Sequence, residues 1–339
     1  MIGDPMIRSP MKNTRGVRPR TLLAAMALVV IVAVVVAVVW LAYPREGVEL
    51  EGFSAESTAT VSYAGMFPAE DEPGLLNPLG IVIHGTTLYV AESDAGRIRL
   101  FGLSGQEHGS IVVPVASGAP TAYPSDIATL GADRIVVVDN SGSRVIVMDS
   151  DLEADQGSVI VIGENDPETA PVQPTAVAVD RETIYVADGA DASIRAYGSD
   201  GVYQRTVVKN TGDSMMLAGG LIVADGRLYA ADSNSGRVSI FDVEDGSPKG
   251  LFPDAFALPR GLGAGLAGGL LVVDTFERTV RLADRDGRRI DVIDGNAKGD
   301  GSLTSPRDVA WAPSSMRAYV TDAESGRIVI FNMRELNQK

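Results

Sequence analysis

Six carboxylates recur along this chain of 339 residues, each at the end of a short apolar segment. They are spaced 42 to 49 residues apart and comprise Glu92, Asp139, Asp188, Asp232, Asp274 and Asp322. A ring of carboxylates could bind a cation, because hard metal ions prefer oxygen ligands. Most of the six, however, precede a turn rich in Ser, Asn or Gly, where a carboxylate accepts backbone N–H bonds. We therefore interpret these six residues, called the anchors below, as structural, and we predict no metal site.

An arginine follows four of the anchors at a constant interval of five residues: Arg97, Arg144, Arg237 and Arg327. Across a tight hairpin, this spacing places the two residues opposite each other on neighbouring strands, where opposite charges attract. The sequence therefore predicts cross-strand ion pairs at these four anchors.

Arg260 and Arg307 are the main candidates for ligand binding. Each directly follows a proline that lies roughly a dozen residues before an anchor, so the two arginines occupy equivalent positions in successive copies. Two converging guanidinium groups suit a carboxylate or a phosphate. The alternative is that they pair with nearby acids such as Asp308 or Asp300, or face solvent. Asp126 and Asp308, one position further along in their own copies, are secondary candidates for the same site.

The elements that must position these residues are short strands in a repeating unit. Each copy opens with Pro78, Pro124, Pro174, Ala218, Pro259 or Pro306, followed by a hydrophobic run, a turn and the strand that ends at the anchor. A period in the forties with several strands per unit is typical of a β-propeller. We therefore predict an all-β fold of six four-stranded blades. In the first copy the expected strands cover residues 81–83, 88–91, 97–101 and 110–115.

The sixth copy ends before its outer strand. Residues 58–63 have the alternation of a strand and no copy of their own, so we predict that they supply the missing strand beside residues 328–331. Such a closure removes a free sheet edge that would otherwise invite aggregation.

Residues 22–42 are uncharged and almost wholly apolar, which is enough for one membrane-spanning helix. A cleaved signal peptide would have a shorter apolar core and a small-x-small cleavage site, whereas this run ends in Trp40-Leu41-Ala42. We expect an uncleaved signal anchor at 21–43, between a basic tail at 1–20 and a linker at 44–57. Because the positive charges precede the span, the N-terminus is expected in the cytoplasm and the propeller, at 58–339, outside the cell membrane.

Composition excludes several functional classes. The chain has no cysteine, which rules out disulfides and thiolate chemistry. Its net charge is −15, and because the first 20 residues carry +4, the remainder carries −19. Phosphate backbones would be repelled by such a domain, so no nucleic-acid partner is expected. No phosphate-binding loop or nucleophile elbow with its structural context is present.

The repeats resemble those of the NHL family of six-bladed propellers. The resemblance covers residues 59–331 and is carried by Tyr185-Val186-Ala187-Asp188, by Asp232-Ser233-Asn234-Ser235-Gly236-Arg237 and by Asp322-Ala323-Glu324-Ser325-Gly326-Arg327. The family consists mostly of binding platforms, with a minority of enzymes. The resemblance therefore implies a propeller fold and favours a binding function. The chain is also similar to the extracellular NHL sensor halves of bacterial receptor kinases, although no kinase domain is present.

The enzymes among related propellers have site residues that this chain lacks. In lactonase- and paraoxonase-like propellers, the calcium ligands often follow the opening proline. The matching residues here are Leu79, Ser125, Thr175, Gly219, Arg260 and Arg307, none of which is a carboxylate or Asn. Amidating-lyase propellers need a histidine-rich zinc site. This chain has only His84 and His108, both expected in turns, and two ligands do not make a catalytic zinc site.

Two functions follow from these observations. The favoured one is a membrane-anchored interaction scaffold or sensor module that binds a protein, a peptide or an envelope glycan without a cofactor. The alternative is a metal-dependent hydrolase or lyase that uses the mouth of the propeller channel.

Overall fold

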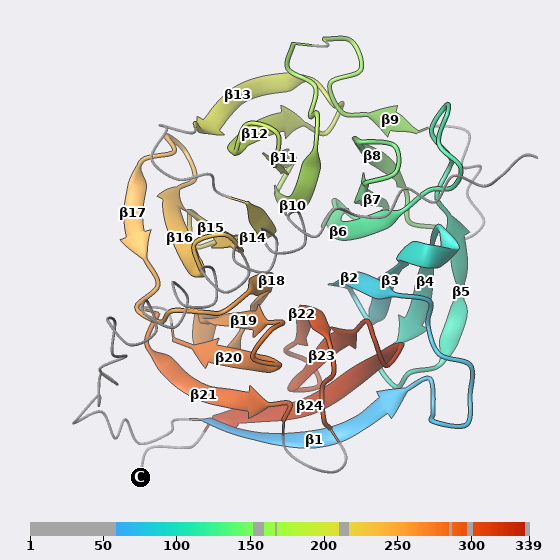
Figure 1. The fold of residues 1–339 in the computed structure, drawn as a ribbon, viewed down its shortest axis with the longest axis vertical. Coiled ribbons are helices and arrows are strands. Elements are labelled where there is room, and N and C mark those ends of the chain that lie inside the picture. The colour runs from blue at the N-terminus through green and yellow to red at the C-terminus, as the bar shows by residue number, and fades with distance from the viewer. Residues whose placement is uncertain are drawn as a thin grey trace, which may run out of the picture. The chain divides into compact units, whose positions relative to one another are not determined.

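The computed structural model describes residues 59–335, except 152–158, 167, 210–216, 285–286 and 297–300. These residues form six four-stranded antiparallel sheets, or blades, around a central axis (Figure 1). The predicted all-β, six-bladed propeller is therefore confirmed. In blades 1–5 the four strands follow chain order, from an inner strand at the axis to an outer strand at the rim (Figure 1).

The first three blades follow one another along the chain. Blade 1 contains β2 (Pro78–His84), β3 (Thr87–Glu92), β4 (Arg97–Gly102) and β5 (Glu107–Val112), with the 3-10 turn η1 (Ser93–Ala95) after β3. Blade 2 contains β6 (Pro124–Leu130), β7 (Arg134–Asp139), β8 (Arg144–Asp149) and β9 (Ile160–Val161). Blade 3 contains β10 (Pro174–Asp180), β11 (Thr183–Asp188), β12 (Ser193–Gly198) and β13 (Tyr203–Val208).

The remaining three blades complete the ring. Blade 4 contains β14 (Ala218–Ala224), β15 (Arg227–Asp232), β16 (Arg237–Asp242) and β17 (Pro248–Leu251). Blade 5 contains β18 (Pro259–Ala264), β19 (Leu270–Asp274), β20 (Thr279–Ala283) and β21 (Arg289–Asp294), with the 3-10 turn η2 (Leu266–Gly268) before β19. Blade 6 contains β22 (Pro306–Ala312), β23 (Arg317–Asp322), β24 (Arg327–Glu335) and β1 (Ala59–Phe67).

Blade 6 joins the two ends of the ring. Strand β1 pairs antiparallel with β24, and Tyr63 lies opposite Phe331 (Figure 1). The predicted closure is therefore confirmed, and the strand extends four residues beyond the expected end at Tyr63. A β-bulge between Tyr63 and Gly65 lets this long strand curve along the rim. Closure pairs the outer edge of β24 with β1, so that blade 6 has four strands like the other blades.

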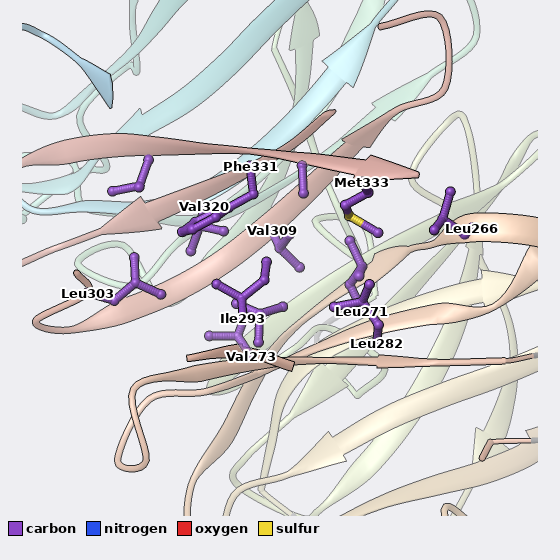
Figure 2. Close-up of a cluster of buried hydrophobic side chains, with 13 residues drawn as sticks. Leu266, Leu271, Val273, Leu282, Ile293, Leu303, Val309, Val320, Phe331 and Met333 are labelled. Atoms are coloured by element: carbon purple, nitrogen blue, oxygen red, sulfur yellow. The ribbon is translucent and has the colours of Figure 1, made fainter. Parts of the chain in front are cut away.

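Hydrophobic side chains fill the six interfaces between neighbouring blades. Between blades 5 and 6, for example, Val273 and Ile293 pack toward Val309, Val320 and Phe331 (Figure 2). The second strand of each blade is covered on both faces by its neighbours, as in residues 135–138, which are fully buried. A strand buried on both faces reads as a continuous apolar run. This is why the segments that end at the anchors do not alternate with polar residues.

Small residues let the inner strands approach one another at the axis. A Cβ atom on Gly220 would lie 2.1 Å from the carbonyl oxygen of Arg260, and one on Gly261 would lie 2.5 Å from Cα of Asp308. Any larger residue at these two positions would push adjacent blades apart. Glycine is therefore required there by packing rather than by backbone conformation.

Two local expectations are corrected. The outer strand of blade 1 covers Glu107–Val112, three residues earlier than expected, because the turn after β4 is tighter than the composition indicated. His84 and His108 lie within β2 and β5 rather than in turns. The predictions for residues 1–20, 21–43 and 44–57 fall outside the described residues. Within the described part of the chain, no helix has the length and apolar character needed to cross a membrane.

Candidate functional site

The six inner strands enclose a central channel with a cavity of about 460 Å³. Each of these strands runs from its opening residue at one end of the channel to a more apolar segment at the other end. All six contribute residues to the wall along most of their length. All four predicted ligand-binding residues line this cavity: Asp126, Arg260, Arg307 and Asp308.

The two ends of the channel differ in chemistry. The residues that follow the opening position form the upper ring: Leu79, Ser125, Thr175, Gly219, Arg260 and Arg307. The residues four positions later form the lower ring: Ile83, Thr129, Val179, Val223, Ala264 and Trp311. Four of the six residues in the upper ring are polar, and two of these carry a positive charge, whereas the lower ring carries no charge and is apolar except for Thr129.

Arg260 is positioned by contacts from two blades. The anchor of its own blade, Asp274, accepts the backbone N–H of Leu258 at 3.0 Å, just ahead of Pro259. From blade 4, Ser233 Oγ donates to the carbonyl oxygen of Pro259 at 2.7 Å. Because both sides of the opening proline are held, the start of β18 has a defined place at the upper ring.

Arg307 is positioned by the same arrangement one blade later. Its anchor, Asp322, accepts the backbone N–H of Ser305 at 2.7 Å. From blade 5, Thr275 Oγ1 donates to the carbonyl oxygen of Pro306 at 2.7 Å. The anchors and the hydroxyl groups that follow them thus determine where both arginines enter the channel.

The two guanidinium groups are close enough to influence each other and have no acidic partner. Burial and the positive charge of Arg260 together lower the pKa of Arg307 to about 10, and Tyr123 opposes the shift. Burial also lowers the pKa of Arg260. Among the described residues neither arginine forms an ion pair, and the buried Nε of Arg260 has no hydrogen-bond partner. The alternative pairing with Asp308 is therefore absent, and Asp300 lies outside the described residues.

Asp126 and Asp308 lie below the arginines and connect adjacent inner strands. Asp308 Oδ2 accepts a hydrogen bond from Ile81 N at 2.9 Å, and Asp126 Oδ2 accepts one from Val177 N at 2.8 Å. Each carboxyl group also accepts the N–H of the residue that follows it. The two bridges join equivalent positions of the repeat, so β22 meets β2 in the same register as β6 meets β10.

The surroundings of these two carboxyl groups favour their protonated forms. Burial raises the pKa of Asp126 well above its ordinary value, and the charge of Asp308 raises it further. Burial raises the pKa of Asp308 to about 7, although two backbone N–H groups lower it. In the described part of the chain, no group of three or more His, Cys, Asp or Glu is arranged to hold a metal ion.

Tyr123 and Asn140 complete the upper part of the cavity and were not predicted. Tyr123 directly precedes the opening proline of blade 2, and Asn140 directly follows the anchor of that blade. The Tyr123 hydroxyl accepts a hydrogen bond from Asn77 Nδ2 at 2.9 Å. The only sequence signal for these residues was their position next to the repeat landmarks, which places them at the same end of the channel as the arginines.

The anchors accept hydrogen bonds from the segments that lead into the opening residues. Each accepts at least one backbone N–H from 15 to 17 residues upstream: Leu76 for Glu92, Tyr123 for Asp139, Gln173 for Asp188, Leu217 for Asp232, Leu258 for Asp274 and Ser305 for Asp322. The sequence indicated bonds only to the turn that follows. All six anchors are almost completely buried, and none belongs to the wall of the cavity.

Two of the four predicted ion pairs form. Arg97 Nε lies 2.5 Å from Glu92, and Arg144 Nε lies 3.0 Å from Asp139. The other two predictions are wrong, although both arginines stand opposite their anchors in the strand register. Asp232 is instead bonded by the Ser235 hydroxyl at 2.7 Å.

Arg327, the other arginine without its predicted partner, donates to the backbone carbonyls of Glu70 and Glu72. Two other anchors use an arginine seven residues on: Arg195 lies 2.7 Å from Asp188, and Arg281 lies 3.8 Å from Asp274. Two extra residues along the third strand return the side chain to the same face of the sheet, within reach of the anchor.

Comparison with known proteins gives structural likeness alone. No family model and no curated protein matches the chain. A protein of unknown function from Bacteroides thetaiotaomicron has a TM-score of 0.62 at 17% identity, covering 81% of this chain and 76% of its own. Virginiamycin B lyase from Staphylococcus aureus has a TM-score of 0.55 at 12% identity, with coverages of 83% and 90%. A streptogramin B lyase has a TM-score of 0.56 at 13% identity, with coverages of 81% and 98%. The chain is thus a six-bladed propeller whose structural neighbours include the virginiamycin B lyase type.

Proposed function

We propose that this protein is a membrane-anchored, extracytoplasmic binding or sensor module that recognises an anionic group at the mouth of its channel. The observation that carries the proposal is the pair of half-buried arginines, Arg260 and Arg307, which line one cavity without an acidic partner among the described residues. Two like charges in partial burial repel each other, and an anion between them would relieve that repulsion. A protein, peptide or envelope glycan partner would offer a carboxylate or a phosphate for this site.

The surface charge of the domain supports this placement. Away from the N-terminal tail the chain carries a net charge of −19. Against this background, two positive charges at one mouth of the channel lower the electrostatic energy of an approaching anion there. The attraction should weaken as salt is added, because screening shortens the range of the field.

The test is anion binding by the full-length protein in detergent, measured by isothermal titration with inorganic phosphate and with acetate. The variant Arg260→Ala/Arg307→Ala should lose at least one of these interactions. The control Arg237→Ala/Arg289→Ala removes the same charge from two exposed arginines outside the cavity. If both double variants bind as the native protein does, the arginine pair is not the site.

The location outside the cell rests on the basic residues before the apolar segment at 22–42 and on the acidic residues after it. In spheroplasts, added protease should digest the propeller without lysis. Protection of the propeller until the membrane is broken would reverse the proposed orientation.

A hydrolase or lyase is the second candidate function. It is favoured by Asp308, a carboxyl group with a pKa of about 7 in the same cavity as the arginines, because such a group can donate or accept a proton near neutral pH. Solved lyases of the same fold also exist. Stoichiometric calcium or zinc in the purified protein would favour this candidate, and a metal-free protein that binds anions would favour the binding module.

A further inference from the structure

We propose that the channel takes a small amphipathic acid lengthwise, with its anionic head between Arg260 and Arg307 and its apolar body in the lower ring. The inference rests on the proposed anion site and adds the class of ligand. The upper ring supplies the only charged side chains at either ring of the described channel, and the lower ring supplies apolar walls. A ligand that matches both must have one charged end and one apolar end.

The dimensions suit a small molecule. The two rings are four residues apart along extended strands, which corresponds to about 13 Å at about 3.3 Å per residue. The cavity of about 460 Å³ falls within the range of pockets that enclose small ligands. A folded protein could contact the mouth of such a channel but could not occupy it.

The lower ring has apolar side chains that are not fully buried by the blades. Ile83, Val179, Val223 and Trp311 each retain exposure at the cavity and each packs on its other side against an interblade cluster. Apolar surface that remains exposed in a recess gains free energy when an apolar ligand covers it. Packing on the other side holds these side chains in place, so the walls are already formed before a ligand enters.

The middle of the channel selects against a second negative charge. Asp126 and Asp308 line the cavity between the rings, and burial raises the pKa of both groups. An uncharged chain can pass these carboxyl groups whether or not they are protonated. A ligand with a second carboxylate would have to desolvate that charge at the lower ring, where none of the described residues that line the cavity carries a positive charge.

The test uses the full-length protein in detergent, with protein-free micelles as the blank, and compares acetate, butyrate, hexanoate and octanoate by equilibrium dialysis. We expect the affinity to rise by up to about fourfold for each added methylene group that enters the channel. Octanedioate, which has the same length as octanoate and a second carboxylate, should bind more weakly than octanoate. Equal affinities for acetate and octanoate, or for octanoate and octanedioate, would overturn the proposal.

Two variants separate this inference from the proposed function. Val179→Thr/Val223→Thr keeps the shape of the lower ring and adds two hydroxyl groups, so it should reduce the gain per methylene and leave acetate binding unchanged. Arg260→Ala/Arg307→Ala should abolish binding of every acid in the series. If binding is lost in the arginine variant but does not depend on chain length, the proposed class of ligand is wrong and the proposed anion site is supported. If binding rises with chain length and ignores the arginines, both are wrong.

Discussion

The six anchors are almost completely buried, whereas the two channel carboxyl groups, Asp126 and Asp308, are partly buried in the cavity wall, and the surroundings of the two sets differ. An anchor such as Asp188 accepts N–H groups from the turn and the lead-in segment and pairs with Arg195 at 2.7 Å. Burial alone would raise the pKa of Asp188, but these donors outweigh burial and lower it. Asp126 has two N–H donors and a neighbouring acid, and its pKa is raised.

The comparison shows that burial by itself does not decide the charge of a carboxyl group. The number of donors and the presence of a cation decide it. The charged form of Asp188 is favoured because its N–H donors come from the repeat itself and Arg195 pairs with it. The channel pair lies where adjacent inner strands meet, and this surface offers fewer donors and no arginine partner among the described residues.

The largest expected effect comes from removing an anchor that has an arginine partner. Asp139→Ala would leave Tyr123 N and Gly142 N without their acceptor and Arg144 without its counter-charge. We expect a loss of about 3–5 kcal/mol in the free energy of unfolding, measured by urea denaturation. Asp126→Ala, which leaves only backbone donors unpaired, should cost about 1–3 kcal/mol. Equal losses would contradict the distinction between the two sets.

The second prediction concerns how stability changes between acidic and neutral pH. Asp308 has a pKa of about 7 in the folded protein and about 3.9 when unfolded, so the folded state binds the proton more tightly. The stabilisation that Asp308 contributes is complete below its pKa in the unfolded protein and is lost as the pH rises through its folded pKa of about 7. The free energy of unfolding should therefore fall between about pH 4 and about pH 7, and Asp308→Asn should flatten that fall. An unchanged slope in Asp308→Asn would show that Asp308 is charged throughout.

The contribution of Asp188 to stability should depend on pH in the opposite sense, in the acid range. Its pKa is lowered in the folded protein, so its contribution is present above the unfolded value and is lost as pH falls through the folded value. Asp188→Asn should therefore destabilise the protein at neutral pH and converge with the native protein in acid. Parallel stability curves for the two proteins across the acid range would argue against a lowered pKa.

The smallest effect is expected at the anchor whose predicted arginine partner is missing. Asp232 accepts Leu217 N through Oδ1, and the Ser235 hydroxyl donates to Oδ2. Asp232→Asn keeps the first acceptor, and Ser235 can accept from the new amide group, so the cost should be about 1 kcal/mol or less. Asp139→Asn should cost more because Arg144 loses its partner. The two costs would be similar only if the ion pair contributes little.

The repeat was sufficient to predict the ring. Six anchors at a period in the forties imply six blades, because each unit is too small to bury its own apolar face and must stack on the next. The incomplete sixth copy and the unassigned strand at the start of the ring imply closure, since a free edge is costly. Equivalent positions in the repeat also implied that Arg260 and Arg307 lie at the same end of one channel. The membrane anchor at 21–43 stays a prediction.

Only the tertiary structure decided what surrounds each charge. Asp308 bonds to Ile81 across the closure of the ring, and Asp126 bonds to Val177 of the next blade. The sequence repeat gives the position of each residue within its own blade. It could therefore place Asp308 and Asp126 on the inner strands but could not predict which residue of another blade each would contact. Arg327 likewise lies opposite its anchor in the strand register, but it donates to the carbonyls of Glu70 and Glu72, in the segment that leads into blade 1. Proton affinity and ion pairing depend on donors and burial contributed by neighbouring blades, and those become defined when the ring closes.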